Sequence, residues 1–220
     1  MEINAKMVNE LRKKTGAGIM DCKRALTEVE GDIDKAVTYL REKGIASAGK
    51  KADRVAAEGL VESYIHMGGK IGVLVEVNCE TDFVARGDDF RNFRREISMQ
   101  VAAASPRYLL AEDVPESVID EERKIYRKQA EESGKPEKVW DKIAEGRLKK
   151  FYSEVCLMEQ PYVREQKMTV EKLRKELVAK TGENVVVRRF ARFELGEGIE
   201  KKKTDLAAEV AQQIEQAKKS

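Results

Sequence analysis

The residues that could carry chemistry do not form a catalytic pattern in this sequence. The three cysteines, Cys22, Cys79 and Cys156, lie far apart and match neither a zinc-binding spacing nor a disulfide framework. His66 is the only histidine, and no serine, cysteine or aspartate constellation is evident around it. Acidic residues are numerous, but none stands out as a convergent pair, and no nucleophile motif occurs. We therefore predict a protein that is not an enzyme, has no catalytic residue and needs no metal or cofactor.

Asp82 and Phe83 are candidates for a binding contact rather than for catalysis. The run 71–78 alternates as a half-buried strand does, and the next helix is predicted to begin near Asp88 and Asp89, whose side chains suit an N-cap. Residues 81–86 therefore form a strand-to-helix corner. Phe83 is either a lid on the core, with Asp82 as a cap, or a wedge for a partner's pocket, where its burial would contribute about 1.5–3 kcal/mol. From the residue pattern alone the lid is preferred.

The elements around this corner predict an α+β fold. A hairpin of strands 59–67 and 71–78 turns at 68–70, and the run 184–195 adds a third strand, giving a small antiparallel three-stranded sheet with helices on one side. One helix ends before Ser105 and presents a single apolar face. Another is capped by Thr169 and closed by Gly182, after an extended loop at 160–163. The apolar residues of the first helix are Phe90, Phe93, Ile97 and Val101.

Further helices flank the sheet. Three short helices, separated at 15–18, at Gly31 and at Gly44, predict an N-terminal three-helix module. Two charged helices joined near Gly134 predict an antiparallel helical hairpin, the first with Val118, Ile119, Ile125 and Tyr126 facing inward and the second opened by Pro136. A C-terminal helix is expected from Thr204. The expected division is 1–45 for the N-terminal module, 46–56 for a solvated linker, 57–195 for the core with its hairpin at 115–155, and 196–220 for the C-terminal module.

Composition limits the classes of partner. Forty-two basic and forty acidic residues leave a formal net charge of +2, so we expect no direct nucleic-acid binding through a broad basic face. No apolar run approaches the ~18 residues that span a membrane, and the first residues lack the features of a signal peptide. A cytoplasmic protein in a reducing compartment is expected.

Five blocks, in the same order along the chain, carry a resemblance to a known family. The chain resembles elongation factor Ts in a short form with a single core half. The blocks are Thr81-Asp82-Phe83-Val84 after Val77-Asn78-Cys79-Glu80, the run 11–26, the run 145–151, Gln160-Pro161-Tyr162-Val163, and the run 192–199.

The resemblance implies a fold and an activity. The N-terminal module would be ubiquitin-associated-like, and the hairpin would be a protruding coiled-coil arm. The activity would be guanine-nucleotide exchange on elongation factor Tu, with GDP release promoted by displacing Mg²⁺ and distorting the nucleotide site. The residues expected at the Mg²⁺-displacing contact are Thr81, Asp82, Phe83 and Val84, and those expected at the other contacts are Ile19, Met20, Lys23, Val163, Val210 and Gln213.

Two further expectations concern assembly and the competing class of function. A three-stranded sheet with exposed edges and a free face invites a second copy, so we predict a homodimer through the core and a two-plus-two complex with elongation factor Tu. The main alternative is an adaptor that binds ribosomes or peptides, with a merely structural core.

Overall fold

The computed structural model describes residues 3–199, so the expected helix from Thr204, with Val210 and Gln213, lies outside the described residues. Within them, the order of helices and strands has the α+β composition predicted from the sequence. The helices are α1 (Ala5–Thr15), α2 (Ile19–Glu28), α3 (Ile33–Ala48), α4 (Asp82–Ala85), α5 (Asp88–Ala104), α6 (Glu116–Glu132), α7 (Trp140–Val155) and α8 (Val170–Thr181). The strands are β1 (Glu58–Ile65), β2 (Ile71–Cys79), β3 (Pro161–Tyr162), β4 (Glu165–Thr169) and β5 (Val185–Glu194).

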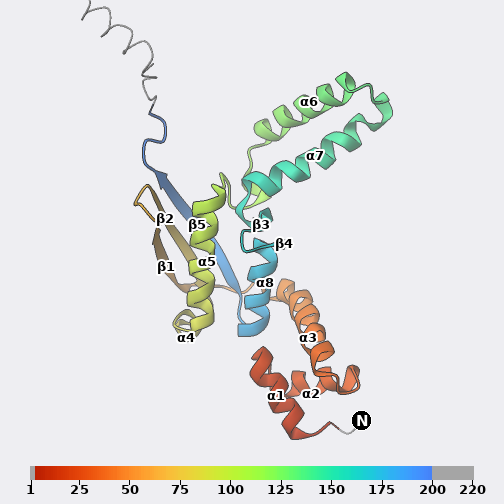
Figure 1. Cartoon of the computed structure of the whole chain (residues 1–220), viewed down its shortest axis with the longest axis vertical. Coiled ribbons are helices and arrows are strands. Elements are labelled where there is room, and N and C mark those ends of the chain that lie inside the picture. Colours follow the sequence, from red (N-terminus) through yellow and green to blue (C-terminus); the bar gives the residue numbers. More distant parts are fainter. Residues whose placement is uncertain (1–2, 200–220) are drawn as a thin grey trace, which may run out of the picture.

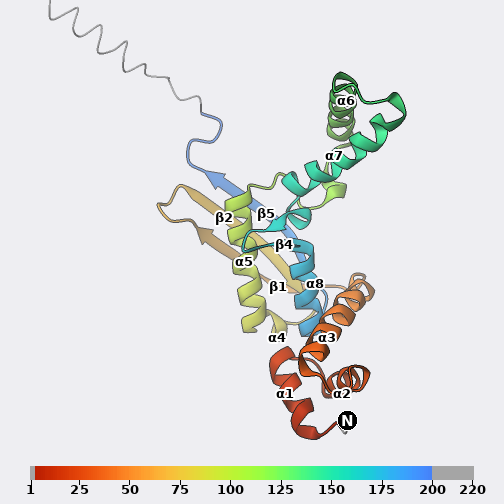
Figure 2. The ribbon, with the colours of Figure 1, turned by 45° about the vertical axis from the view of Figure 1, so that its right-hand side comes forward.

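The main sheet has the order β1-β2-β5 with both pairings antiparallel, which confirms the predicted three-stranded sheet. β2 is the central strand, and its Val73, Val75 and Val77 are buried as the alternating pattern predicts. These side chains pack against α5 and α8, which cover one face of the sheet (Figures 1 and 2). The sheet therefore supports the corner at the end of β2 from a well-packed layer.

Local signals explain the bounds of the two covering helices. All four predicted apolar residues of α5 are buried, and α5 ends where Ser105 takes a left-handed conformation. α8 begins where the Thr169 side chain accepts a hydrogen bond from the Lys172 amide, and it ends at the left-handed Gly182. α5 differs from expectation at its start, because its N-cap is Gly87, and Asp88 and Asp89 lie in the first turn without a side-chain cap bond.

The three N-terminal helices share a core of their own, which includes Leu11, Ala25 and Leu26. The prediction that the third helix ends at Gly44 is wrong, since α3 continues through this residue. A Cβ on Gly44 would lie 2.5 Å from the Ala179 Cβ of α8, so the glycine here permits close helix packing. α3 thus connects the N-terminal helices directly to the core.

α6 and α7 lie side by side and project away from the sheet (Figure 1). Their mutual packing buries Ala130, Ala144 and Leu148. Ile125, expected to face inward, is 41% exposed, whereas Ala130 later in the same helix is buried. Pro136 precedes a single 3-10 turn, Glu137–Val139, and α7 begins only after that turn.

The loop expected at 160–163 is partly a strand. β3 pairs with β4 in a separate two-stranded sheet, with Pro161 opposite Thr169 and Tyr162 opposite Glu165. Sequence reasoning missed β4 because its exposed Glu165, Gln166 and Lys167 lack the apolar alternation that marks a strand.

Candidate functional site

The corner after β2 is a short helix with a defined cap. The Thr81 side chain accepts a hydrogen bond from the Val84 amide at 3.3 Å, which makes Thr81 the N-cap of α4. Asp82, expected as a cap in one interpretation, instead pairs with Arg86 one turn later at 2.8 Å. Val84 is half-buried against the core. Thr81, Asp82 and Val84 therefore each make a different kind of contact.

Phe83 is the exposed member of this group. Its side chain is 84% exposed although both of its neighbours in sequence are held by the contacts just described. The interpretation of Phe83 as a lid on the core is therefore wrong. A large apolar ring at a fixed, exposed corner is suited to insertion into a pocket of another molecule.

The last residue of β2 contacts the backbone of the corner. The Cys79 thiol donates to the Thr81 carbonyl oxygen at 3.1 Å. Burial, and then the nearby Glu183 carboxylate, raises the pKa of Cys79 to about 11, so the thiol is protonated at neutral pH. Burial likewise raises the pKa of Cys156 to about 11. Both cysteines thus behave as structural thiols rather than nucleophiles.

Glu183 was missed by sequence reasoning and lies at the centre of the corner's hydrogen bonds. Its carboxylate accepts from the Glu80 and Thr81 amides and from the Thr81 hydroxyl. The contact joins residues about a hundred positions apart, which no local pattern reveals. The available signal was a polar pair, Glu183 and Asn184, between a helix-ending glycine and the β-branched run that begins the third strand.

The expected N-terminal contact residues lie together on the outside of α2. Ile19 and Met20 are exposed, Met20 at 70%, and Lys23 is exposed on the same helix. Cys22, between them, is fully buried in the core of the N-terminal helices. The first turn of α2 thus presents an apolar pair beside a cation to solvent.

Val163 lies in the turn between β3 and β4, and its side chain is exposed. Its amide donates to Gln100 Oε1 at 2.9 Å, and the buried Gln100 side chain in turn donates to Gln160 Oε1 at 3.0 Å. Gln100 lies near the end of α5, whereas Phe83 precedes its start. The structure therefore separates Val163 and Phe83 by most of the length of α5.

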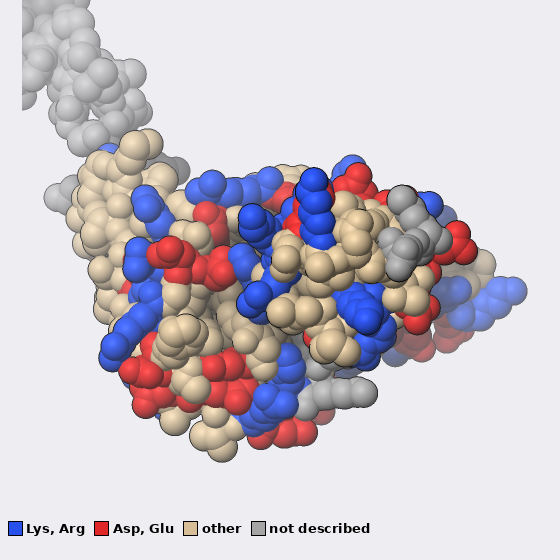
Figure 3. Space-filling view, turned by 90° about the horizontal axis from the view of Figure 1, so that it is seen from below, with Lys and Arg blue, Asp and Glu red and all other residues tan. Residues whose placement is uncertain are grey.

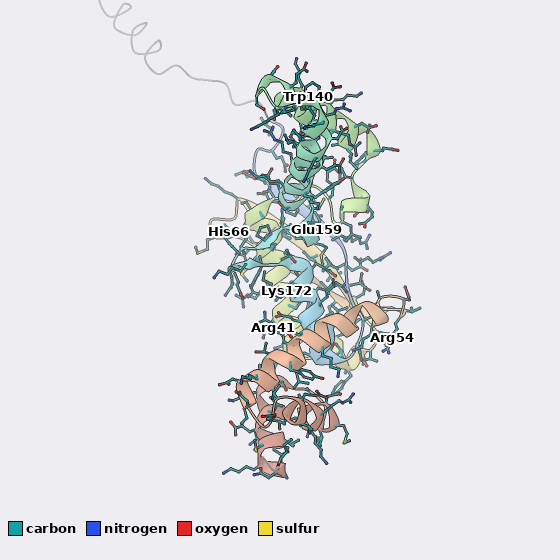
Figure 4. All side chains as sticks on the ribbon, turned by 90° about the vertical axis from the view of Figure 1, so that its right-hand side faces the viewer. Arg41, Arg54, His66, Trp140, Glu159 and Lys172 are labelled. Carbon is teal, nitrogen blue, oxygen red and sulfur yellow. The ribbon has the colours of Figure 1, made fainter. Side chains whose placement is uncertain are left out.

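A cleft of about 730 Å³ lies between the N-terminal helices and the end of α8. Part of its charged lining is paired, because Arg41 contacts Glu176 at 2.6 Å and Lys180 contacts Asp89 at 2.6 Å. Figure 4 shows Arg41 on α3 at this junction. The residues that line the cleft come mainly from the N-terminal helices on one side and from the end of α8 on the other, so it is a joint between two parts of the chain.

Charge is mixed at the end of the molecule that carries α1, α2 and α4. Blue and red side chains are interspersed over this face (Figure 3). Among residues 3–199, no three histidine, cysteine or acidic side chains gather as a metal site would require. The same residues contain no helix both long and apolar enough to cross a membrane.

Comparison with known proteins agrees with the blocks seen in the sequence. The family model described as Elongation factor TS matches residues 3–197. The chain belongs to the elongation factor Ts family. Among relatives named elongation factor Ts, that of Desulforamulus reducens is 59% identical over 213 residues, covering 97% of this chain and 98% of the relative.

Other members of the elongation factor Ts family are equally similar. That of Geobacter sulfurreducens is 60% identical over 211 residues, covering 96% of this chain and 98% of the relative. That of Caldanaerobacter subterraneus subsp. tengcongensis is 63% identical over 199 residues, covering 90% of this chain and 100% of the relative. Membership assigns the chain to translation elongation in protein biosynthesis.

Proposed function

We propose that this chain is a cytoplasmic guanine-nucleotide exchange factor that promotes GDP release from the GTPase elongation factor Tu. The observation that carries the proposal is the exposed Phe83 ring on the capped corner after β2, within a chain of the elongation factor Ts family. The corner offers a rigid apolar wedge, and exchange requires a wedge rather than a reacting group.

Linkage explains why no catalytic side chain is needed. A GTPase holds GDP through backbone amides and a Mg²⁺ ion. A factor that binds well only when that site is distorted weakens GDP binding by the reciprocal factor. Each ~1.4 kcal/mol of this coupling corresponds to a tenfold change in GDP affinity.

The corner residues divide this work. Phe83 enters an apolar pocket of the GTPase, while Thr81 and Val84 hold the corner in shape. Asp82 displaces Mg²⁺ by perturbing the water network around it. The Asp82–Arg86 pair is solvent-exposed, and pairs of this kind contribute only about 0–1 kcal/mol, so Asp82 is released at little cost.

Anchoring contacts offset the free energy of distortion. Ile19, Met20 and Lys23 form one anchor and Val163 another, and their exposed positions away from Phe83 support this division. Val210 and Gln213, outside the described residues, form the third. Anchors at separate places keep Phe83 inserted in the GTPase, although distortion of the nucleotide site costs free energy.

We assign the parts of the chain accordingly. Residues 1–45 are a ubiquitin-associated-like partner-binding module, and 46–56 are its linker. Residues 57–195 are the exchange core, with the coiled-coil arm at 115–155, and 196–220, which extend beyond the described residues, are a C-terminal module.

The uncovered face of the sheet supports a homodimer. On the side away from α5 and α8, four large apolar residues of the three strands are exposed. They are Val61, Ile65, Leu74 and Phe193, which we call the outer sheet patch. A second copy covers this patch, so that two factors and two GTPases form a two-plus-two complex.

The test is release of fluorescent GDP from purified elongation factor Tu with increasing amounts of this protein. The release rate should rise and saturate. Release at the intrinsic rate at every concentration would refute exchange. Recovery of the chain with ribosomal particles alone would then support the adaptor alternative.

A further inference from the structure

We propose that Glu183 is the positioning residue of the Phe83 corner and that, with Asn184, it joins this corner to the linker from the N-terminal helices. The inference rests on the proposed exchange function and names residues that hold its wedge in place. Neither residue belongs to the family motifs noted above, and both follow directly after α8.

The first part of the argument is the set of bonds that Glu183 accepts. Its Oε2 accepts from the Glu80 amide at 3.2 Å and from the Thr81 amide at 3.0 Å, and its Oε1 accepts from the Thr81 hydroxyl at 2.7 Å. Thr81 Oγ1 in turn accepts from the Val84 amide at 3.3 Å. One carboxylate therefore fixes the residue that caps α4, and this cap sets the direction of Phe83.

Hydrogen bonds run both ways between the residue that follows β2 and the residues that precede β5. While Glu183 accepts from the Glu80 amide, Glu80 Oε1 accepts from the Asn184 amide at 2.6 Å. Gly182 makes this possible, because its left-handed conformation ends α8 and turns the chain back toward β2. The reciprocal pair holds the end of β2 and the start of β5 at a fixed separation.

Asn184 extends the junction to the linker. Its buried side chain donates to the Ala52 carbonyl oxygen at 3.1 Å and to the Arg54 carbonyl oxygen at 2.8 Å. Arg54 also lies 3.5 Å from the Glu80 carboxylate. Figure 4 shows Arg54 beyond the end of α3, on the connection that leads from the N-terminal helices to the sheet. The linker that follows the N-terminal helices and the corner that carries Phe83 are thus held by one hydrogen-bonded junction.

The junction depends on the hydrogen bonds of the side chain at position 183 rather than on its negative charge. A glutamine at 183 keeps one oxygen for the two amides, and its amide group can donate to Thr81 Oγ1, which has capacity for a second donor. Alanine at 183 removes all three contacts. The amide variant should therefore preserve what the alanine variant loses, and a role that depends on charge would give the opposite result.

The experiment compares Glu183→Ala and Glu183→Gln with Glu176→Ala. Glu176 lies on the same helix that precedes Glu183 but pairs with Arg41 of α3, away from the corner. Hydrogen exchange of the Thr81 and Val84 amides is measured on the factor alone. The maximal GDP-release rate and the half-saturating factor concentration are then measured with elongation factor Tu.

We expect Glu183→Ala to speed exchange of the two amides and to lower the maximal release rate about 2- to 10-fold, which corresponds to the net value of about one hydrogen bond. The half-saturating concentration should change less, because the anchors remain. Glu183→Gln should restore both readouts, and Glu176→Ala should leave the maximal rate unchanged.

Other outcomes would overturn the proposal. Unchanged amide exchange and an unchanged maximal rate in Glu183→Ala would remove the positioning role, as would failure of Glu183→Gln to restore them. If Glu183→Ala does not fold, Thr81→Val deletes the shortest of the three contacts, that between the Thr81 hydroxyl and Glu183. A wild-type maximal rate in that variant would equally refute the role. If the wild-type factor itself does not accelerate release, the proposed function fails, and amide exchange still decides whether the junction holds the corner.

Discussion

Gly44 on α3 and Ala179 on α8 approach so closely that a side chain on the glycine would overlap the alanine, with 2.5 Å between the two Cβ positions. The pair lies where the N-terminal helices meet the core, beside the Arg41–Glu176 ion pair. A glycine inside a helix ordinarily costs about 1 kcal/mol relative to alanine. Here the absence of a side chain is what allows the two helices to pack.

We expect Gly44→Ala to destabilise the fold. Overpacking of a close contact costs about 1–3 kcal/mol, which outweighs the gain in helix propensity. Gly146 provides a matched control, because it also lies inside a helix but a Cβ added there would meet no neighbouring atom within 4 Å. Gly146→Ala should stabilise the protein in urea unfolding. Equal effects of the two changes would contradict a tight contact at Gly44.

Phe83→Ala should slow GDP release without unfolding the factor. Loss of a buried ring at the partner, worth about 1.5–3 kcal/mol, corresponds to about 10- to 150-fold in the release rate if the contact forms only in the exchange transition state. Because Phe83 is exposed, the free energy of unfolding should change by less than about 0.5 kcal/mol. Circular dichroism and fluorescent GDP release measure the two effects.

The buried Phe93 of α5 is the control for that experiment. Phe93→Ala should cost about 3–5 kcal/mol of stability. A Phe83→Ala factor with wild-type release and an intact fold would refute the wedge.

Met20→Ala should weaken docking while leaving the wedge intact. We expect a higher half-saturating factor concentration and an unchanged release rate at saturation, because Met20 contributes to binding in the ground state and transition state alike. Leu26→Ala in the same helix removes a fully buried side chain and should instead destabilise the N-terminal helices by about 2–5 kcal/mol. A full-affinity Met20→Ala factor would remove this residue from the proposed anchor.

Phe193→Glu should convert the proposed dimer to a monomer. The residue is 67% exposed in the outer sheet patch, so a charge there leaves the fold of one chain intact but cannot be buried against a second copy. Light scattering at micromolar concentration gives the mass. A monomeric wild-type factor, both free and bound to elongation factor Tu, would exclude this assembly.

Stability should depend on pH through Glu171 of α8. Burial raises the pKa of its carboxyl, but two 2.7 Å hydrogen bonds from Arg174 and the charge of Lys175 outweigh burial and lower the pKa. A lowered pKa in the folded state contributes stability above the unfolded pKa of about 4.3, and this contribution is lost as pH falls through the folded value.

Urea unfolding between neutral and acidic pH tests this relationship. The wild-type free energy of unfolding should fall below about pH 4.3, and Glu171→Gln should make the fall shallower. Arg174→Gln removes the partner and should also make it shallower. Identical pH curves for wild type and Glu171→Gln would contradict the prediction.

Local pattern was sufficient for much of the fold. The alternation along β2 and the spacing of Phe90 and Ile97 predicted which faces are buried, because both reflect contact with a single core. The cap at Thr169 and the helix end at Gly182 were likewise readable from residue type. The corner itself was predicted as a strand-to-helix junction.

What sequence reasoning missed depends on partners distant in the chain. Local sequence predicts a helix end at Gly44 because the contact with Ala179 exists only in the folded chain. Glu183 was missed because its acceptor role is defined by amides of residues 80 and 81. The residue pattern alone favours Phe83 as a lid and is wrong there, since the same ring on a corner suits a lid or a wedge and only the packing of the sheet distinguishes them.

The two ends of the α6–α7 hairpin are hydrogen-bonded to each other where they meet the core. The Arg107 and Tyr108 amides both donate to the Val155 carbonyl oxygen, and the Leu157 amide donates to the Tyr108 carbonyl oxygen. The chain therefore leaves and re-enters the core at adjacent points. Lengthening or shortening α6 and α7 together by whole turns would therefore leave these two points in place, as insertions at an exposed site do. Such changes leave Phe83, at the opposite end of α5, where it is.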